Sequence, residues 1–272
     1  MSKAVKFLQS IVLVLIGVFH IIPFYILLNV SLKPTTDTSS YWRLPKTVYF
    51  DNFTNVWTNG KLGRALINNT IITFWVVFIV VLVGACSAYP LARFKTKWNN
   101  FVYAVFVSSM IVPSMTILVP LYKMIVDLVG TSTYPSVILP NISAELTTAI
   151  FLYTGFISSI PRELDESAYM DGCSIFGIFF KILLPLLKPV TATVVILTGV
   201  HVWNDYANGM FFLQRPNMYN LNVALNQFMT KYANDTNWVA AGCLIGMIPM
   251  TLLYLSLQKY FIKGLTAGAV KG

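Results

Sequence analysis

Residues 166–189 read ESAYMDGCSIFGIFFKILLPLLKP. The stretch begins with acidic and small polar residues, yet it lies between long hydrophobic runs that carry almost no charge. Its composition and spacing predict a short helix, a turn and a second helix. The fold therefore depends on whether the flanking runs are long enough to cross a membrane.

The composition of the chain places it among membrane proteins. Of its 272 residues, 56% are hydrophobic and only 11% are charged, which lies well outside the range of soluble domains. We expect an all-α membrane protein, because a helix satisfies its own backbone hydrogen bonds in lipid. The net charge of +9 comes from basic residues in short loops, which favours anionic lipid over nucleic acid as a partner. Cys86, Cys173 and Cys243 have no metal or redox spacing.

Six apolar runs are long enough to cross a hydrocarbon core, which takes roughly 20 helical residues. They cover residues 7–32, 67–91, 100–123, 138–160, 181–213 and 238–262. The first run follows Lys3 and Lys6 as a signal peptide would, but it is too long and has no small-x-small cleavage site. We therefore interpret it as a retained membrane helix.

The chain divides into three parts on this interpretation. Residues 1–66 hold the first membrane helix and a polar extracytoplasmic loop, in which Tyr41, Trp42 and Trp57 suit the headgroup level. Residues 67–262 form a core of five helices, and residues 263–272 form a C-terminal tail.

The basic residues favour an orientation with both termini in the cytoplasm. That assignment places eleven of the nineteen lysines and arginines inside, with three of them packed into residues 93–97. The first outer loop spreads five basic residues over more than thirty positions. Dense basic clusters mark the cytoplasmic side of a membrane protein.

The first helix of the polar segment is predicted from residue 162 to residue 171. Pro161 can open it, because the missing N–H would have no partner there, and Gly172 can end it in a left-handed conformation. Leu164, Ala168 and Asp171 are expected on one face, and Glu163 and Glu166 elsewhere. An ordinary acidic connector would show the same pattern.

The second helix is predicted over residues 175–184. Ser174 can cap its first turn, and Pro185 and Pro189 are expected to bend the chain into the next membrane helix.

A family resemblance rests on these residues. The pattern Glu166-x-Ala168-x3-Gly172-x9-Ile182-x-Leu184-Pro185 resembles the EAA signature of permease subunits of bacterial ABC importers, with Ser167 in place of the commoner alanine. The end of the chain, residues 259–272, and Trp203-Asn204-Asp205-Tyr206 resemble the maltose-transporter-type, carbohydrate-uptake branch. The resemblance runs from about Asn68 to the C-terminus.

The resemblance implies the six-helix permease fold of a type I ABC importer and a place in the bacterial cell membrane. It implies a permease subunit of an ATP-driven, binding-protein-dependent carbohydrate importer that is not itself an enzyme. The implied partners are a second homologous permease, two cytoplasmic ATPase subunits that bind ATP and Mg²⁺, an extracytoplasmic solute-binding protein and membrane lipid. This chain is expected to bind no cofactor, since it has no Gly-x4-Gly-Lys-Ser/Thr loop.

The resemblance also assigns ATPase coupling to one group of residues. Their helix would lie in a cleft of the ATPase and transmit its closure to the membrane helices, and the tail at residues 264–272 would reach the same interface. Glu166 would be the charged contact. The group consists of Glu166, Ser167, Ala168, Asp171 and Gly172.

A polar stripe in the fifth membrane run is the candidate substrate path or gate. His201, Asn204, Asp205 and Asn208 stand at i, i+3, i+4 and i+7, and Trp203 and Tyr206 add aromatic faces that suit a sugar ring. The alternative is that the polar groups only hydrogen-bond to neighbouring helices. Glu145 could pair with a basic neighbour or lie in the outer headgroups, and the headgroups are the preferred expectation.

Other functions remain to be weighed against this one. The chain could be a permease for a non-sugar solute, such as a peptide, polyamine or phosphate. An ion-coupled carrier or a channel would need no ATPase partner. A membrane enzyme is disfavoured, because the two histidines, His20 and His201, have no metal spacing.

Overall fold

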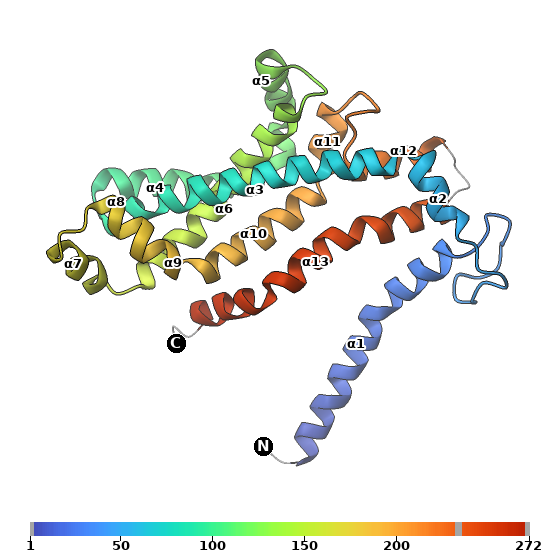
Figure 1. The fold of residues 1–272 in the computed structure, drawn as a ribbon, viewed down its shortest axis with the longest axis horizontal. Coiled ribbons are helices and arrows are strands. Elements are labelled where there is room, and N and C mark those ends of the chain that lie inside the picture. Colours follow the sequence, from blue (N-terminus) through green and yellow to red (C-terminus); the bar gives the residue numbers. More distant parts are fainter. Residues whose placement is uncertain (1–2, 232–235, 270–272) are drawn as a thin grey trace. The chain divides into compact units, whose positions relative to one another are not determined.

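The computed structural model describes residues 3–231 and 236–269, and each regular element in those ranges is a helix (Figure 1). The helices form two compact units. Unit 1 contains Met1–Leu66 and Val223–Ile248, and unit 2 contains Ile67–Asn222 and Pro249–Gly272.

Four of the described helices are long and apolar enough to cross a membrane. A bent pair of shorter helices, Ile175–Leu186 and Lys188–Trp203, would make a fifth crossing if it counts as one. The chain is therefore a multi-pass helical membrane protein. The four helices cover Val5–Ser31, Leu62–Arg93, Tyr134–Ser159 and Thr236–Tyr260.

Unit 1 includes helix α1 and the loop that follows its C-terminal end. Its elements are α1 (Lys3–Ser31), α2 (Asp51–Thr58), most of α12 (Leu221–Lys231) and the first residues of α13 (Thr236–Ala269). Gly242 of α13 allows the close packing of these elements. A Cβ there would lie 2.5 Å from Leu225 Cδ2 and 3.1 Å from Val56 Cγ2, so only glycine fits without a shift.

Unit 2 has a core of three neighbouring segments. Val76 of α3 (Leu62–Arg93), Tyr153 of α6 (Tyr134–Ser159) and Leu183 of the π-helix η2 (Ile178–Leu183) are fully buried in it. Helix α10 (Lys188–Trp203) packs along α6. The remaining elements of the unit are α4 (Lys97–Ser109), η1 (Ser114–Ile117), α5 (Leu118–Val129), α7 (Glu163–Met170), α8 (Ile175–Gly177), α9 (Leu184–Leu186) and α11 (Ala207–Phe212).

The predicted membrane run at residues 100–123 is not one helix. Helix α4 ends at Ser109, and the chain continues through η1 into α5. Pro113 accounts for the break, because it has no N–H to donate and the residue before a proline disfavours helical backbone angles.

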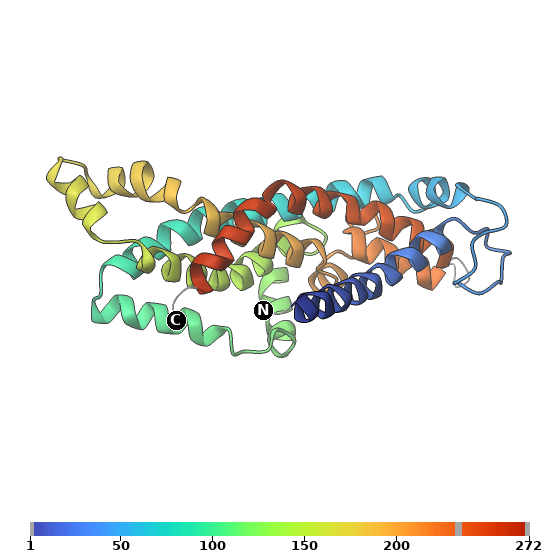
Figure 2. The ribbon, with the colours of Figure 1, turned by 90° about the horizontal axis from the view of Figure 1, so that it is seen from below.

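The two ends of unit 2 carry different elements. Helices α7 and α8 lie at one end, beyond the end of α3, and α5 and α11 lie toward the other (Figures 1 and 2). The segment predicted from residues 166–189 therefore stands at the tip of the bundle that α3, α6 and α10 form.

The expected C-terminal tail at residues 263–272 begins within a helix. The backbone of α13 continues to Ala269, while residues 270–272 and the side chains from residue 261 onward lie outside the described part of the chain. The predicted contact of this tail with an ATPase stays a prediction.

Candidate functional site

The turn after α7 has the geometry that its sequence predicts. Cys173 N–H donates to the carbonyl of Ala168 and Gly172 N–H to that of Tyr169, both at 3.0 Å. These two bonds make a Schellman motif, which needs a left-handed residue at the position of Gly172. Gly172 has a φ of +83°, so this prediction is confirmed.

Within this chain, the backbone angle is what requires glycine at position 172. No atom of the chain lies within 4 Å of where its Cβ would stand, so a larger side chain would meet open space on this side of the interface. The expectation that no larger side chain fits against the ATPase stays a prediction.

The inward face of α7 includes Ala168 but neither Leu164 nor Asp171, the two residues expected on the same face. Ala168 is buried and Asp165 is half-buried, whereas Leu164 and Asp171 are exposed. The face toward the bundle is thus set by Asp165 and Ala168, three residues apart. Three carboxylates, those of Glu163, Asp165 and Glu166, lie in the first turn, where the helix dipole favours negative charge.

Arg93, the last residue of α3, holds α7 in place. Its Nε lies 2.8 Å from Asp165 Oδ2, and its Nη2 donates to Asp165 Oδ1 at 3.1 Å. Its Nη1 donates to the carbonyl of Ile160, at the end of α6, at 2.9 Å. One guanidinium therefore joins the ends of α3 and α6 to the first turn of α7, and both charged side chains are largely shielded from solvent.

The outer surface of this segment is apolar with an acidic residue beside it. Met170 and Phe176 are 84% and 77% exposed, and Tyr169 and Ile175 are exposed as well. Glu166 is exposed on α7 next to them. Large exposed apolar side chains next to a charge are typical of a surface that another protein covers. Ser167 is exposed, and its Oγ donates to the carbonyl of Glu163, one turn back in α7, at 2.6 Å.

The second half of the segment bends sharply. Ser174 Oγ accepts a hydrogen bond from Gly177 N–H at 3.2 Å, which confirms it as the cap of α8. The chain then passes through η2 and α9, and the axis of Ile175–Leu186 makes an angle of 72° with that of Lys188–Trp203. Pro185 and Pro189 each occupy a first-turn position of the helix that follows, which confirms that the prolines mark the bend.

The polar stripe predicted at His201, Asn204, Asp205 and Asn208 is interrupted. Helix α10 ends at Trp203 and α11 begins at Ala207, so these side chains do not share one helical face. Asp205 Oδ1 accepts from Asn208 N–H at 3.1 Å, which caps the new helix. Its other oxygen accepts from Asn141 Nδ2 at 2.9 Å. The carboxylate of Asp205 therefore has partners within this chain, as the structural alternative requires.

Asparagine side chains stabilise the break between α10 and α11. The carbonyl of Trp203 accepts from Asn69 Nδ2 at 3.1 Å and from Asn222 Nδ2 at 3.0 Å. Asn220 Nδ2 donates to the carbonyl of Asp205 at 2.6 Å. These amides supply the hydrogen bonds that a continuous helix would have given those carbonyls.

Two residues of the stripe remain exposed. Asn204 donates only to the carbonyl of Val200, one turn back, and His201 presents most of its ring to solvent. Tyr206 is half-buried.

The preferred expectation for Glu145 was a free carboxylate in the headgroups. The structure instead buries its side chain on α6 and pairs it with a basic neighbour. Its Oε1 stands 2.5 Å from His201 Nδ1. The pairing removes the cost of a lone carboxylate inside the bundle.

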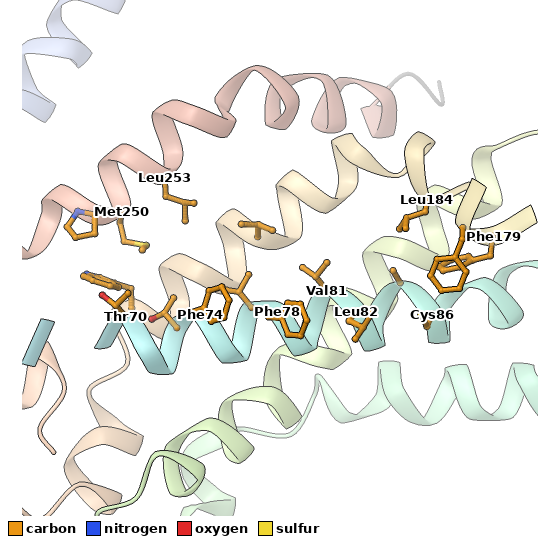
Figure 3. A pocket seen from close by; sticks show the side chains of 17 residues that line it. Thr70, Phe74, Phe78, Val81, Leu82, Cys86, Phe179, Leu184, Met250 and Leu253 are labelled. Carbon is orange, nitrogen blue, oxygen red and sulfur yellow. The ribbon is translucent and has the colours of Figure 1, made fainter. Parts of the chain in front are cut away.

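A groove on the surface of unit 2 is a poor candidate for a sugar site. It has a volume of about 600 Å³ and runs between α3, α10 and the residues of α13 near Met250 (Figure 3). Its walls are mainly aromatic and aliphatic, with Phe74, Phe78 and Leu253 among them (Figure 3). A sugar needs convergent hydrogen-bonding groups, which such walls do not offer.

Three functional candidates escaped the sequence analysis. Arg93 was counted only as one member of the basic cluster at residues 93–97, although an arginine that directly ends an apolar run is a signal for an ion pair with a carboxylate. Asp165 was one of several carboxylates, and Glu145 had two possible environments. Within residues 3–231 and 236–269, no group of three or more metal-ligating side chains was found.

Comparisons with known proteins agree with this geometry. Residues 80–267 match the model of a family described as "Binding-protein-dependent transport system inner membrane component". The chain is 47% identical over 254 residues to the melibiose/raffinose/stachyose import permease protein MelC of Bacillus subtilis, which covers 93% of this chain and 92% of that protein. It is 30% identical over 263 residues to the arabinooligosaccharides transport system permease protein AraQ of the same organism, over 95% and 93% of the two chains.

The fold also has a counterpart among solved structures. A chain from the crystal structure of a bacterial ABC transporter that imports the acidic polysaccharide alginate superposes with a TM-score of 0.76. The match covers 96% of this chain and 99% of the other, at 20% sequence identity. At that identity the likeness concerns the fold.

Proposed function

The chain belongs to the family of binding-protein-dependent transport system inner membrane components, and from this premise we propose that it is a permease subunit of an ATP-driven importer of oligosaccharides. The observation that carries the proposal is the segment formed by α7 and α8 at the tip of the bundle. Arg93 attaches this segment to the membrane helices, and its apolar surface at Met170 and Phe176 is exposed. Such a segment has no use in a membrane protein that works alone, but it suits a subunit that receives force from another chain.

Relatives support the solute class. MelC and AraQ, named for melibiose, raffinose and stachyose and for arabinooligosaccharides, each align with more than nine tenths of this chain. The proposal of an oligosaccharide rests on these two names, with more weight on MelC at 47% identity. A non-sugar solute is the alternative within the same class of transporter.

The proposed membrane topology has six crossings and both termini in the cytoplasm. The helices of α4, η1 and α5 together make the third crossing, and the bent pair that ends in α10 makes the fifth. We divide the chain as residues 1–66, 67–262 and 263–272: a first helix with an outer loop, a permease core and a cytoplasmic tail. This is the six-helix arrangement of a type I importer.

The proposed partners follow from the surface of the coupling segment. An ATPase subunit receives Met170 and Phe176 in an apolar cleft and pairs a basic residue with Glu166. ATP and Mg²⁺ are bound by two such subunits, a second homologous permease completes the pore, and an extracytoplasmic binding protein delivers the solute. Asp171 and Gly172 shape the turn, while Ser167 and Ala168 belong to the body of α7.

The mechanical argument depends on Arg93. Because its guanidinium joins α7 to the ends of α3 and α6, a displacement of α7 moves those two helices as well as α10, which follows it in the chain. The movement would reach the far end of the bundle, where His201 and Asn204 are exposed. We propose that these two residues line the gate of the solute path, with Tyr206 beside them, and that Asp205 and Asn208 hold its shape.

The test is reconstitution with the ATPase, permease and binding-protein partners in vesicles. The expected result is ATP-dependent uptake of labelled raffinose or stachyose, with little uptake of a labelled peptide. Glu166→Lys should reduce the amount of ATPase that co-purifies with the permease, whereas the matched variant Glu163→Lys, in the same helix turn, should leave it unchanged.

Several results would contradict the proposal. ATP hydrolysis by this chain alone would overturn the division of labour, and uptake driven by an ion gradient without an ATPase would indicate a carrier or channel. Uptake of only non-sugar solutes would retain the importer and reject the solute class.

A further inference from the structure

The outer loop after α1 folds back along that helix. Tyr25, Asn29 and Lys33 stand at i, i+4 and i+8, so they follow one face of α1 and of the turn that continues it. All three donate to the loop. Lys33 Nζ donates to the carbonyl of Ser40 at 2.8 Å, and Tyr25 Oη donates to that of Trp42 at 2.8 Å.

Asn29 stands between these two contacts and completes the set. Its Nδ2 donates to the carbonyls of Tyr41 at 2.5 Å and Arg43 at 2.6 Å. The chain from Ser40 to Trp42 therefore runs down the side of α1, from the level of Lys33 to that of Tyr25. It turns at Trp42 and comes back up at Arg43.

The depth of this turn can be estimated from α1 itself. The apolar run of the helix begins near Phe7, just after Lys6, and a hydrocarbon core takes roughly 20 helical residues. A crossing of that length, counted from Phe7, ends at Ile26, and the apolar helix continues to Ser31. Tyr25 lies just inside the end of this minimum crossing, and the rings of Tyr25 and Trp42 are in contact, with centroids 6.4 Å apart. Trp42 is thereby held at the level of the last turns of the apolar helix.

The backbone of the loop is prepared for that environment. Each of the four successive carbonyls from Ser40 to Arg43 accepts a hydrogen bond from a side chain of residues 25–33. A loop on the aqueous surface needs no such partners, because water supplies them. Irregular backbone enters a membrane interface at low cost only when its polar groups are already paired.

The side chains of the loop are exposed and largely apolar. Trp42 is 59% exposed, Leu44 is 72% exposed, and Tyr41 is exposed beside them. Arg43 and Lys46 are next to these residues in the sequence. Tryptophan and tyrosine favour the headgroup level, and long basic side chains can reach lipid phosphates from it.

We propose that residues 40–44 are a lipid-binding loop that inserts into the membrane interface beside α1, with the side chains of Trp42 and Leu44 in contact with acyl chains. The loop lies beside α1, and the most apolar stretch of that helix is not buried by the rest of this chain. The loop and the helix therefore offer adjoining apolar surfaces to lipid. The loop binds phospholipid and anchors the outer end of α1 at a fixed depth. The depth follows from the geometry above, while the choice of the outer leaflet rests on the proposed orientation.

The experiment places a photoreactive benzophenone amino acid at single positions of the complete transporter in vesicles that contain radiolabelled phospholipid. Trp42 and Leu44 are the test positions, and either one suffices if the other variant fails to fold. Thr36, exposed in the same loop but outside the residue 40–44 turn, is the matched control. Illumination should give several-fold more labelled lipid adduct at positions 42 and 44 than at 36.

Other adducts have defined meanings. A crosslink from position 42 or 44 to the partner permease or to the binding protein would overturn the proposal, as would equal lipid adduct at positions 42 and 36. ATP-dependent uptake by the same vesicles reports on the proposed function separately, so a loss of lipid adduct with normal uptake rejects only the lipid-binding loop.

Discussion

Arg93 and Asp165 lie 72 residues apart in the sequence and form an ion pair in which Arg93 Nε is 2.8 Å from Asp165 Oδ2. The pair joins the last residue of the membrane helix α3 to the first turn of α7, the proposed coupling helix. Because the same guanidinium also binds the carbonyl of Ile160, α7 is held between two membrane helices and is not a free connector.

Asp165→Asn should loosen this attachment. The change leaves the buried guanidinium without its counter-ion, and breaking a buried pair from one side costs about 3–5 kcal/mol, the lower end being expected where one partner is partly exposed. Amide hydrogen exchange in residues 163–170 should accelerate, and ATP-driven uptake should fall at equal amounts of assembled transporter. Glu163→Gln, an exposed carboxylate of the same turn, is the control. Unchanged exchange in Asp165→Asn would show that the pair does not hold α7.

Gly172→Ala should destabilise the turn through its backbone angle alone. A non-glycine residue in left-handed geometry costs about 1–2 kcal/mol, although a Cβ at this position would meet no atom within 4 Å. Gly155→Ala is a matched control, because its Cβ would also meet open space but its backbone is helical. That control should stabilise the protein by about 0.5–1 kcal/mol. Thermal unfolding in detergent measures both, and similar effects at the two positions would refute the argument.

Glu145 and His201 should show energetic coupling. His201→Ala leaves the buried carboxylate of Glu145 without its partner. The substitution should therefore lower the free energy of unfolding more in the wild-type protein than in the Glu145→Gln variant. Contacting residues typically couple by about 0.5–3 kcal/mol, and the exposure of the imidazole favours the lower half of that range. A double-mutant cycle on the unfolding temperature gives the coupling. Strict additivity would mean that the contact contributes nothing.

Gly209→Ala should disturb the break between α10 and α11. A Cβ at Gly209 would lie 2.5 Å from Asn220 Nδ2, the atom that donates to the carbonyl of Asp205. Displacing the amide leaves that carbonyl short of a donor, at a cost of about 1–3 kcal/mol. Gly177→Ala is the control, since its Cβ would make only an ordinary 3.5 Å contact with Ser174 Oγ.

The double variant separates steric effects from the lost hydrogen bond. Because Asn220→Ala removes both the donor and the clashing atom, Gly209→Ala should add little to it. If the losses of stability from Gly209→Ala and Asn220→Ala were fully additive, Gly209→Ala would not act by displacing the Asn220 amide.

Residues 163–177, which form α7, the turn and α8, show what local sequence rules can and cannot predict. The positions of Gly172 and Ser174 were predicted correctly, because a left-handed C-terminal residue and a capping hydroxyl are fixed by hydrogen bonds a few residues away. Local spacing did not show which face of α7 is buried. The face turned inward is decided by Arg93, which lies on another helix, and no spacing within residues 162–171 contains that information.

The prediction of a polar stripe was wrong for a related reason. It required one continuous helix through residue 213, but the helix ends at Trp203. The break is stable because Asn69, Asn220 and Asn222 supply donors to its carbonyls, and these residues come from outside the segment. A local pattern cannot show that a distant amide compensates for lost helical hydrogen bonds.

The sequence by itself determined that this is a helical membrane protein of the permease family, and it located the turn at Gly172 and Ser174. Hydrophobic length, charge density and capping residues act within a few turns of chain, so they can be recognised without a fold. The tertiary structure decided which side chains of α7 face the bundle, that Glu145 is paired with His201, and that the loop at Trp42 lies at the depth of Tyr25. Each of these depends on contacts between distant segments, whose free energies arise only when the chain has folded.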